Sequence, residues 1–288
     1  MREGLVRLPI DYAHSPLGRA FREAGHLTGS REYAIGVDPF KGWPKHLRRA
    51  AFHEMGWECD DAAAYPTARQ AMVPPGREVQ TVFLEHREEI FSKVGETLFS
   101  HVICSEARRD IMKKIFAAYD NDATLDGWVK NTPGLPRGAT MRGVAVKVGE
   151  KPGKPGIIFK PEEYWKGQQQ SSMWMWENAG EDLREFMNDR YPKKGLREKR
   201  LLWKSYVLQE AEAVGRDAKI AWAVDHGIPV HSLQHDCVFL GKLPGQLIGR
   251  DDQKLADALS KAVTDASGYA VKVQAQWTEE IEAVRWVD

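Results

Sequence analysis

Apolar residues fall into two short runs between Ile228 and Gly241, in the sequence IPVHSLQHDCVFLG. Two apolar segments bounded by Pro and Gly are typical of strands, so this stretch predicts a β-hairpin. A polar pair, His235 and Asp236, separates the runs and puts a carboxylate at the predicted turn. The alternative is an ordinary surface turn, because Asp is common in turns.

Helical spacing is found on both sides of this hairpin. Between 204 and 225, apolar residues recur every three or four positions, which predicts a long amphipathic helix before the first strand. After the hairpin, Asp252 precedes a second apolar stripe that ends at Ser267, and residues 269–276 alternate like a half-buried strand. The predicted order is helix, hairpin, helix, strand.

A second strand ending in carboxylate is predicted earlier in the chain. Trp57–Cys59 is predicted as a short strand that runs into Asp60 and Asp61, and Pro66 begins a helix. The alternative is that the two Asp residues only cap that helix.

Further helices are predicted over 79–100, from its apolar stripe, and from Ser105, which can act as the cap. On the second helix, Arg109 and Lys113 lie four residues apart and share one face. Such cations usually belong to a solvated, salt-bridged surface, with Glu106 and Asp110 as the nearby acids.

The segment from 144 to 167 alternates Lys with Gly and Pro, which predicts a hairpin whose turn spans 149–155. Trp174 and Trp176 lie in a Met-rich cluster that is expected in the core, with base stacking as the less favoured alternative. A basic run precedes the long helix and is a candidate track for nucleic-acid phosphates. It consists of Lys193, Lys194, Arg197, Lys199, Arg200 and Lys204.

Composition limits the class of protein. The chain has 288 residues, with 41 basic and 41 acidic side chains, so a histone-like, charge-driven binder is disfavoured, whereas a basic cleft is not excluded. The 3 cysteines are scattered, which supports neither a disulfide framework nor a zinc ribbon. No apolar run reaches the roughly 18 residues of a membrane span, and no signal peptide is evident. We therefore expect an intracellular protein without membrane contact.

The hairpin sequence LQHDCV resembles motif C of family A DNA polymerases and of the single-subunit phage-type RNA polymerases. In that family, a His-Asp pair lies at a hairpin turn, and the Asp binds metal. The DNA enzymes usually have Glu after this Asp and the RNA enzymes have Ser, whereas this chain has Cys237.

The strand near residue 60 resembles motif A in a divergent plasmid-like, viral and protist branch of the same family. There, an acid-x-Asp strand is followed by an aromatic residue and Pro, and Glu58, Asp60, Tyr65 and Pro66 match this pattern. The resemblance implies that Asp60 binds metal. For Tyr65 two interpretations stay open: its ring lies against the sugar of the nucleotide, where it would favour DNA synthesis, or it is an aromatic residue at the helix start that packs ahead of Pro66.

The third resemblance is to motif B, a helix with Arg, then Lys four residues later, then Tyr-Gly, whose cations bind the triphosphate. Arg109, Lys113 and Tyr119 are similar to it. Tyr119 comes two residues early and Asp120 replaces the Gly, so the cations transfer better than the Tyr.

Together these resemblances imply an α+β fold: a polymerase palm with a small antiparallel sheet backed by helices, plus a helical, partly β fingers-like insertion. The expected parts are 1–104 with motif A, 105–194 with motif B and the Lys/Gly/Pro-rich insertion, and 195–288 with motif C. The implied function is addition of nucleotides to a primer 3′ end on a nucleic-acid template. Two Mg²⁺ or Mn²⁺ ions held by Asp60 and Asp236 would serve this reaction, with His235 near the primer end.

Two other functions remain open at this stage. A zinc-dependent hydrolase could use His231, His235, Asp236 and Cys237. A noncatalytic nucleic-acid-binding remnant of a polymerase is the second, because no thumb is recognisable and motif B is altered. An accessory subunit that replaces the thumb would reconcile that gap with catalysis.

Overall fold

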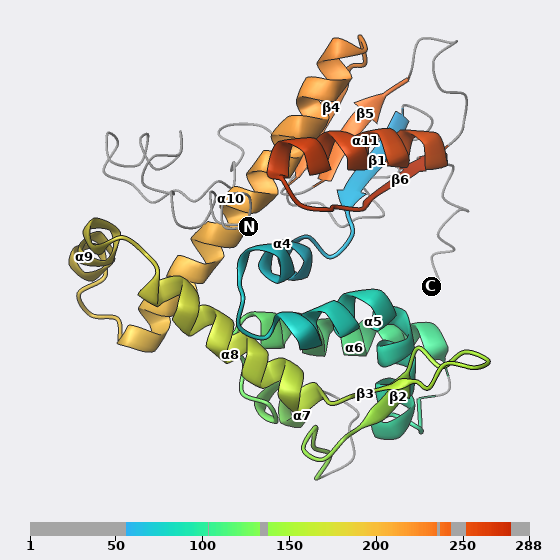
Figure 1. Ribbon diagram of the computed structural model, residues 1–288, viewed down its shortest axis with the longest axis vertical. Helices are drawn as coiled ribbons and strands as arrows, with labels where there is room; N and C mark the ends of the chain where they lie inside the picture. Colours follow the sequence, from blue (N-terminus) through green and yellow to red (C-terminus); the bar gives the residue numbers. More distant parts are fainter. Residues whose placement is uncertain (1–55, 103, 133–137, 235–236, 243–251, 278–288) are drawn as a thin grey trace, which may run out of the picture. The chain divides into compact units, whose positions relative to one another are not determined.

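The computed structural model describes residues 56–102, 104–132, 138–234, 237–242 and 252–277. Over these residues the protein is α+β, as the sequence predicts, with a four-stranded sheet, a two-stranded sheet and helices α4 to α11 (Figure 1). The chain divides into two compact units. The first unit comprises Met1–Ala68 with Tyr206–Asp288, and the second comprises Arg69–Ser205. The predicted boundaries at 104 and 194 follow the motifs and differ from this division.

The first unit contains the four-stranded sheet, in which all neighbouring strands are antiparallel in the order β4-β5-β1-β6. These strands are β1 (Gly56–Asp61), β4 (Val230–Gln234), β5 (Cys237–Gly241) and β6 (Val273–Trp277). Gly56 opens β1 because a Cβ there would lie 1.7 Å from the carbonyl oxygen of Leu240 on β5. The predicted hairpin of 228–241 is thus confirmed as β4 and β5.

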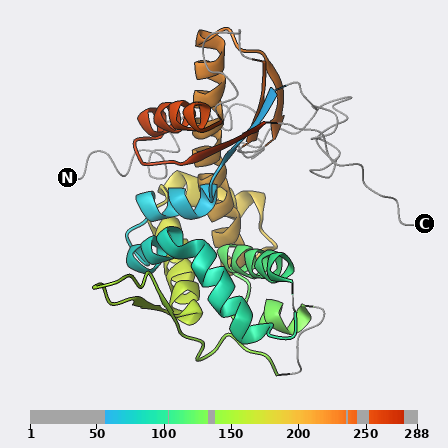
Figure 2. The same ribbon diagram turned by 90° about the vertical axis from the view of Figure 1, so that its right-hand side faces the viewer.

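One face of this sheet is covered by the helices α10 (Leu196–Asp225) and α11 (Asp252–Ser267), of which α10 belongs here from Tyr206 onward (Figure 2). Because side chains alternate along a strand, Trp57 and Cys59 of β1 face this helical layer. They pack with Leu255, Leu259 and Val263 of α11 in a buried apolar core. Glu58 and Asp60, at the intervening positions, face the other side of the sheet.

The second unit is mainly helical. Its elements after α4 (Ala64–Met72), which contains the boundary between the units, are α5 (Arg77–Leu98), α6 (Ser105–Asp120), α7 (Gly127–Asn131), β2 (Val146–Val148), β3 (Ile157–Phe159), α8 (Pro161–Glu177) and α9 (Glu181–Arg190). Its core is aromatic: the rings of Phe83 and Phe116 stack with centroids 5.1 Å apart, and the ring of Tyr164 lies 4.5 Å from that of Phe83. The antiparallel pair β2–β3 confirms the second predicted hairpin.

Most predicted elements are present with shifted boundaries. The helix expected from Pro66 begins at Ala64, and the strand expected over 269–276 is β6. Ser105 is the first residue of α6 and Cys104 is the N-cap, so the prediction that Ser105 caps the helix is wrong. The cluster predicted as core is confirmed only in part: Met175 and Trp176 of α8 are buried, whereas Trp174 is half-buried and Met173 is 39% exposed.

Helix α10 differs from its prediction in its start and in the burial of its polar side. It begins at Leu196, and its polar side is buried as well as its apolar side. The buried charged residues of α10 are Lys204, Glu210, Glu212, Arg216 and Lys219. The helix predicted over 204–225 is present, but the expectation that it is amphipathic is wrong, because spacing alone does not show which charged side chains a core buries. None of the helices in the described ranges is both long and apolar enough to cross a membrane.

Candidate functional site

The candidate site lies on the face of the four-stranded sheet opposite α10 and α11. On β1, Glu58 is 4% exposed and Asp60 is half-buried. The antiparallel register pairs Glu58 with Phe239 of β5, which brings Cys237 level with Asp60. On the other side, β6 pairs Gln274 with Asp60. Asp60, near the end of β1, therefore lies between Cys237, the first residue of β5, and Gln274 of β6.

The electrostatics of Cys237 indicate how near the carboxylates are. Burial raises the pKa of the Cys237 thiol well above its ordinary value, and the negative charges of Asp60 and Glu58 raise it further. Asp60 is thus close enough to the start of β5 to affect the thiol there. His235 and Asp236, which precede Cys237 in the sequence, lie outside the described residues, so their metal-binding and primer-side roles stay predictions.

Asp61, the neighbour of Asp60, has a different environment. It points to the helical side of the sheet, where the Lys219 ammonium of α10 lies 2.8 Å from Asp61 Oδ1 and both side chains are buried. Burial raises the pKa of Asp61, and the Lys219 charge acts in the opposite direction. Gly215 leaves room for this carboxylate, because a Cβ there would lie 3.0 Å from Asp61 Oδ2. The adjacent Asp residues are therefore divided between the two faces of one strand.

The capping alternative for these two residues is wrong. Asp60 and Asp61 are the last residues of β1, and α4 does not begin until Ala64. Between them the chain turns sharply at Ala63, which has a left-handed φ of 53°. Tyr65 is the second residue of α4 and is half-buried, so it follows Asp60 across one tight turn. Its contact with a nucleotide sugar stays a prediction.

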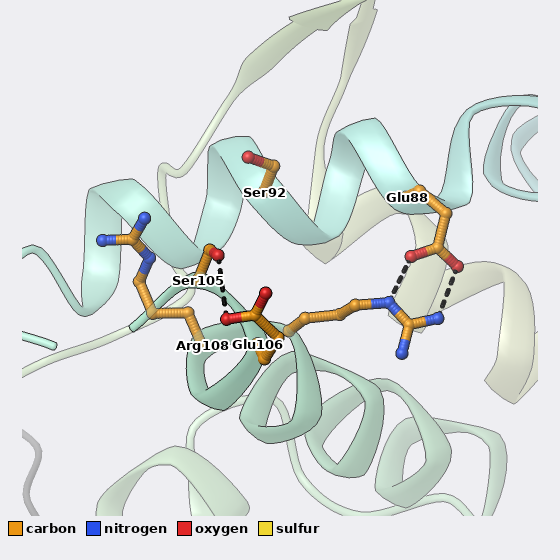
Figure 3. A pocket seen from close by; sticks show the side chains of 6 residues that line it. Glu88, Ser92, Ser105, Glu106 and Arg108 are labelled. Atoms are coloured by element: carbon orange, nitrogen blue, oxygen red, sulfur yellow. Dashed lines mark hydrogen bonds and ion pairs between the residues drawn. The ribbon is translucent and has the colours of Figure 1, made fainter. Parts of the chain in front are cut away.

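Arg109 lies in the second unit and is engaged by a carboxylate. Its Nε and Nη2 donate to the carboxylate of Glu88 of α5 at 2.5 Å and 3.0 Å. Figure 3 shows Glu88 at the pocket beside this pair, with two dashed interactions on its carboxylate. This pairing, chiefly through the Arg109 hydrogen bond, lowers the pKa of Glu88. A cavity of about 170 Å³ lies beside the pair, lined by Glu88, Ser92, Ser105, Glu106, Arg108 and Arg109. Arg109 therefore belongs to a salt-bridged surface, as such cations usually do, but its main partner is Glu88 and not Glu106 or Asp110.

The other two motif B residues differ in exposure. Lys113 is exposed and forms no ion pair with any of the described residues. Tyr119 is 0% exposed, and its hydroxyl donates to the carbonyl of Leu125 at 2.6 Å. Burial raises the pKa of this phenol. Lys113 is therefore available to a ligand, whereas Tyr119 is a core residue and its predicted nucleotide contact gains no support.

The basic run before and within α10 is mostly hydrogen-bonded to the protein. Arg197 Nη2 donates to the carbonyl of Asp122 at 2.7 Å, and Lys199 Nζ donates to Asn188 Oδ1 at 2.9 Å. Lys194 lies 3.5 Å from Glu198, a weak pair, and Lys193 is exposed. Arg200 is half-buried. Only part of this run therefore faces solvent as a phosphate track.

Lys204, the last residue of the run, belongs to a buried polar network that sequence reasoning missed. Its ammonium donates to Asp122 Oδ1 at 2.7 Å and to the carbonyl of Asp120 at 2.6 Å, and burial lowers its pKa. Asp120 in turn accepts from Arg69 at 3.0 Å and from the Tyr164 hydroxyl at 2.7 Å. The signal in the sequence is the pair of acids Asp120 and Asp122, of which Asp120 ends α6 and takes the place of the Gly of motif B.

The zinc-site alternative loses support from the hairpin geometry. His231 lies at the Gly241 end of β5, since a Cβ on Gly241 would lie 2.7 Å from its Nε2. Cys237 is four residues away on the same strand, about 13 Å at the usual rise per residue. Within the described ranges no group of three or more His, Cys, Asp or Glu could hold a metal ion, and the three cysteines are free.

Comparison with known proteins does not assign the chain to a family. No protein-family model matches the chain, and no match was found among curated proteins.

Proposed function

We propose that this protein is a template-directed nucleotidyltransferase that adds nucleotides to a primer 3′ end, with DNA synthesis favoured over RNA synthesis. The observation that carries the proposal is the position of Asp60 on the sheet. It is a half-buried carboxylate at the end of a central strand, level with the first residue of β5. The sequence immediately before that residue is His235-Asp236, so the two resembling motifs fall on adjacent strands of one antiparallel sheet.

The donor set suits a divalent cation of the Mg²⁺ type. Mg²⁺ prefers hard oxygen ligands and is usually held by one or two carboxylates, with phosphates and water completing its shell. Asp60 and Asp236 would hold the ions, and Glu58 adds a second negative charge on the same face as Asp60. When bound, two such ions activate the attacking hydroxyl and steady the leaving pyrophosphate.

The chain's own cations would bind the substrates. Lys113 is the motif B cation that is free to neutralise a triphosphate, whereas Arg109 must first leave Glu88. Lys193 is the member of the basic run best placed to contact template or primer phosphates, because it is exposed and forms no ion pair with a described residue. Lys194 is half-buried beside Glu198, and Arg197, Lys199 and Lys204 are bonded to protein groups. Tyr65 would lie against the sugar and disfavour a 2′-hydroxyl, which is the basis for favouring DNA.

The test is primer extension with Mg²⁺ or Mn²⁺ by variants of the adjacent carboxylates. Asp60→Asn and Asp236→Asn should each lower the extension rate by at least a hundredfold while the thermal transition stays within a few degrees of the parent. Asp61→Asn should lower the thermal transition and leave the extension rate near that of the parent, because it breaks a buried ion pair and does not change the face of the sheet that carries Asp60. Asp236→Asn retaining a rate within tenfold of the parent would refute the proposal.

A second function is favoured by one specific observation, the loss of the motif B triphosphate site. Arg109 is paired with Glu88, Tyr119 is buried, and Asp120 in place of Gly belongs to the buried network. These contacts favour a noncatalytic nucleic-acid-binding protein derived from a polymerase. It would show no metal-dependent extension in the same assay and would still bind primer-template, which fluorescence anisotropy of a labelled primer-template measures.

A further inference from the structure

The β2–β3 hairpin is a part of the second unit that the proposed catalytic chemistry does not use. Its base is fixed: Phe159 is buried in the aromatic core, and the backbone N–H of Gly149 donates to Glu89 Oε2 of α5 at 2.8 Å. Lys93 of α5 also donates to the carbonyl of Lys147 at 2.6 Å. The ribbon therefore starts from a rigid base, and both views show its turn extending beyond the helices of its own unit (Figures 1 and 2).

The turn holds two lysines side by side. Lys151 and Lys154 form an antiparallel bridge, with reciprocal backbone hydrogen bonds of 3.4 Å and 2.9 Å. Pro152 and Gly153 lie between them, and the Gly153 φ of 77° suits the third position of a type II turn. The bridge continues the register of the Lys147–Ile158 pair. Residues paired in this way project to the same side of the ribbon, so the two side chains are neighbours.

These two lysines differ from the others around the hairpin. Lys147, Lys160 and Lys166 each form an ion pair with a glutamate, at 2.7 Å, 2.8 Å and 2.9 Å. Lys151 and Lys154 are exposed, and neither forms an ion pair with a described residue. Like charges directly opposite each other on a ribbon repel. A bound polyanion would remove that repulsion, which favours the binding of a polyanion at this turn.

Exposed apolar side chains adjoin the cations. Ile157 and Ile158 of β3 are 44% and 54% exposed. A membrane-binding tip would carry aromatic or leucine side chains at its end, where they can enter the bilayer interface. Here the end of the turn is Pro-Gly, and the isoleucines lie behind the lysines. Because side chains alternate along a strand, Ile157 and Ile158 face opposite sides, and the register puts Ile158 on the side of the two lysines. Two lysines followed by an exposed isoleucine on one side of a narrow ribbon match a duplex, in which phosphates border a groove that accepts Pro or Ile.

We propose that this hairpin is a nucleic-acid-binding arm whose Lys151 and Lys154 contact the phosphates of a duplex while Ile158 lies against the groove. The identity of the partner rests on the proposed function, because nucleic acid is the polyanion that a nucleotidyltransferase must hold. The arm itself needs neither metal nor nucleotide. Its binding can therefore be measured separately from catalysis.

The experiment is fluorescence anisotropy of a labelled DNA duplex, titrated with the full-length protein in EDTA over a series of KCl concentrations. Each phosphate contact contributes about 0.9 to the slope of log affinity against log salt. The double variant Lys151→Gln with Lys154→Gln should therefore lower the magnitude of this slope by about 1.8. Ile158→Ser should weaken binding severalfold without changing the slope, because it removes no charge.

Lys166→Gln is the matched control, an exposed lysine of the same unit that is already paired with Glu162. It should leave the slope unchanged. An unchanged slope in the double variant, with its circular dichroism spectrum intact, would overturn the proposal. So would binding of the parent to phosphatidylserine vesicles and not to the duplex. Asp60→Asn should retain the full slope, so a loss of extension with a normal slope separates the failure of one proposal from that of the other.

Discussion

At the residue scale, strand alternation decides which of two neighbouring side chains can take part in chemistry. Asp60 and Asp61 are adjacent in sequence, yet one faces the open side of the sheet and the other is paired with Lys219. The same rule separates Cys59 from Cys237. They lie on paired strands but face opposite sides, and burial raises the pKa of Cys59 to about 12. Neither a disulfide nor a thiolate metal ligand is expected from this pair.

Arg109 gives a prediction about competition between a protein carboxylate and a triphosphate. Glu88→Gln weakens the Arg109 pair, and an exposed ion pair of this kind contributes about 0.2–1 kcal/mol. Releasing it should raise the affinity for a fluorescent nucleoside triphosphate in Mg²⁺ about two- to fivefold. Glu96→Gln, on the same helix but bonded to Ser92, should have no effect. If Glu88→Gln and Arg109→Gln both leave the affinity unchanged, Arg109 does not bind the triphosphate.

Glu210 gives a prediction about pH. Burial, followed by the charge of Asp217, raises its pKa from 4.5 to about 7, and its Oε2 has no hydrogen-bond partner. A carboxyl with a raised pKa binds its proton more tightly in the folded state. Its contribution to stability is therefore complete below pH 4.5 and is lost as the pH rises to about 7.

The expected loss is about 2–3 kcal/mol of the free energy of unfolding between pH 4.5 and 7.5. Glu210→Gln should abolish that part of the pH dependence in urea unfolding measured at several pH values. Glu177→Gln, an exposed carboxyl of α8, should leave the profile as in the parent. A parent profile that is flat over this range would contradict the assignment.

At the scale of elements, local periodicity predicts several helices and strands correctly, whereas the helices α7, α8 and α9 are not predicted from it. The hairpin at 228–241, the helix at 252–267 and the hairpin at 146–159 all follow from apolar spacing and from Gly and Pro. Contacts between elements were not predictable in this way. The Glu88–Arg109 pair joins two helices, and no spacing rule within one helix indicates it.

The candidate site shows the same limit. Motif spacing was enough to choose Asp60 and Lys113, whose environments leave them accessible. It could not show that Tyr119 and Lys204 would be buried, because their burial depends on Leu125, Asp122 and other partners brought in by packing. Similarly, the ion pair of Asp61 with Lys219 requires strand β1 to lie against α10, which no local pattern specifies.

The buried Asp61–Lys219 ion pair should make a large contribution to the free energy of unfolding. Lys219→Met leaves the carboxylate of Asp61 buried without its cation and should cost about 3–5 kcal/mol of the free energy of unfolding. The double variant with Asp61→Asn should recover part of this loss, because no unpaired charge then remains. Lys261→Met removes an exposed pair on α11 and should cost less than about 1 kcal/mol. Urea unfolding measures all three, and equal costs for Lys219 and Lys261 would contradict the role of the buried pair.

At the scale of the whole molecule, the two units differ in how they are built. The first unit needs strands from two distant parts of the chain, since β1 pairs with β5 and β6. The second unit is one continuous stretch, Arg69–Ser205, with an aromatic core among its described residues. The charged network of Arg69, Asp120, Asp122 and Lys204 also lies entirely within that stretch. Each charge of this network therefore has its partner inside the second unit.

We therefore expect a fragment comprising residues 69–205 to fold by itself, because a domain with its own core and its own charge partners needs no further chain. It should unfold cooperatively on heating and give a near-ultraviolet circular dichroism signal from its packed aromatic rings. Tyr164→Phe removes the hydroxyl that donates to Asp120 at 2.7 Å, a bond to a charged acceptor that contributes about 1.5–3 kcal/mol. It should lower the transition temperature of the fragment by several degrees and lower the corresponding transition of the full chain equally. A fragment without a cooperative transition, or a Tyr164→Phe shift present only in the full chain, would show that the second unit depends on the first for its fold.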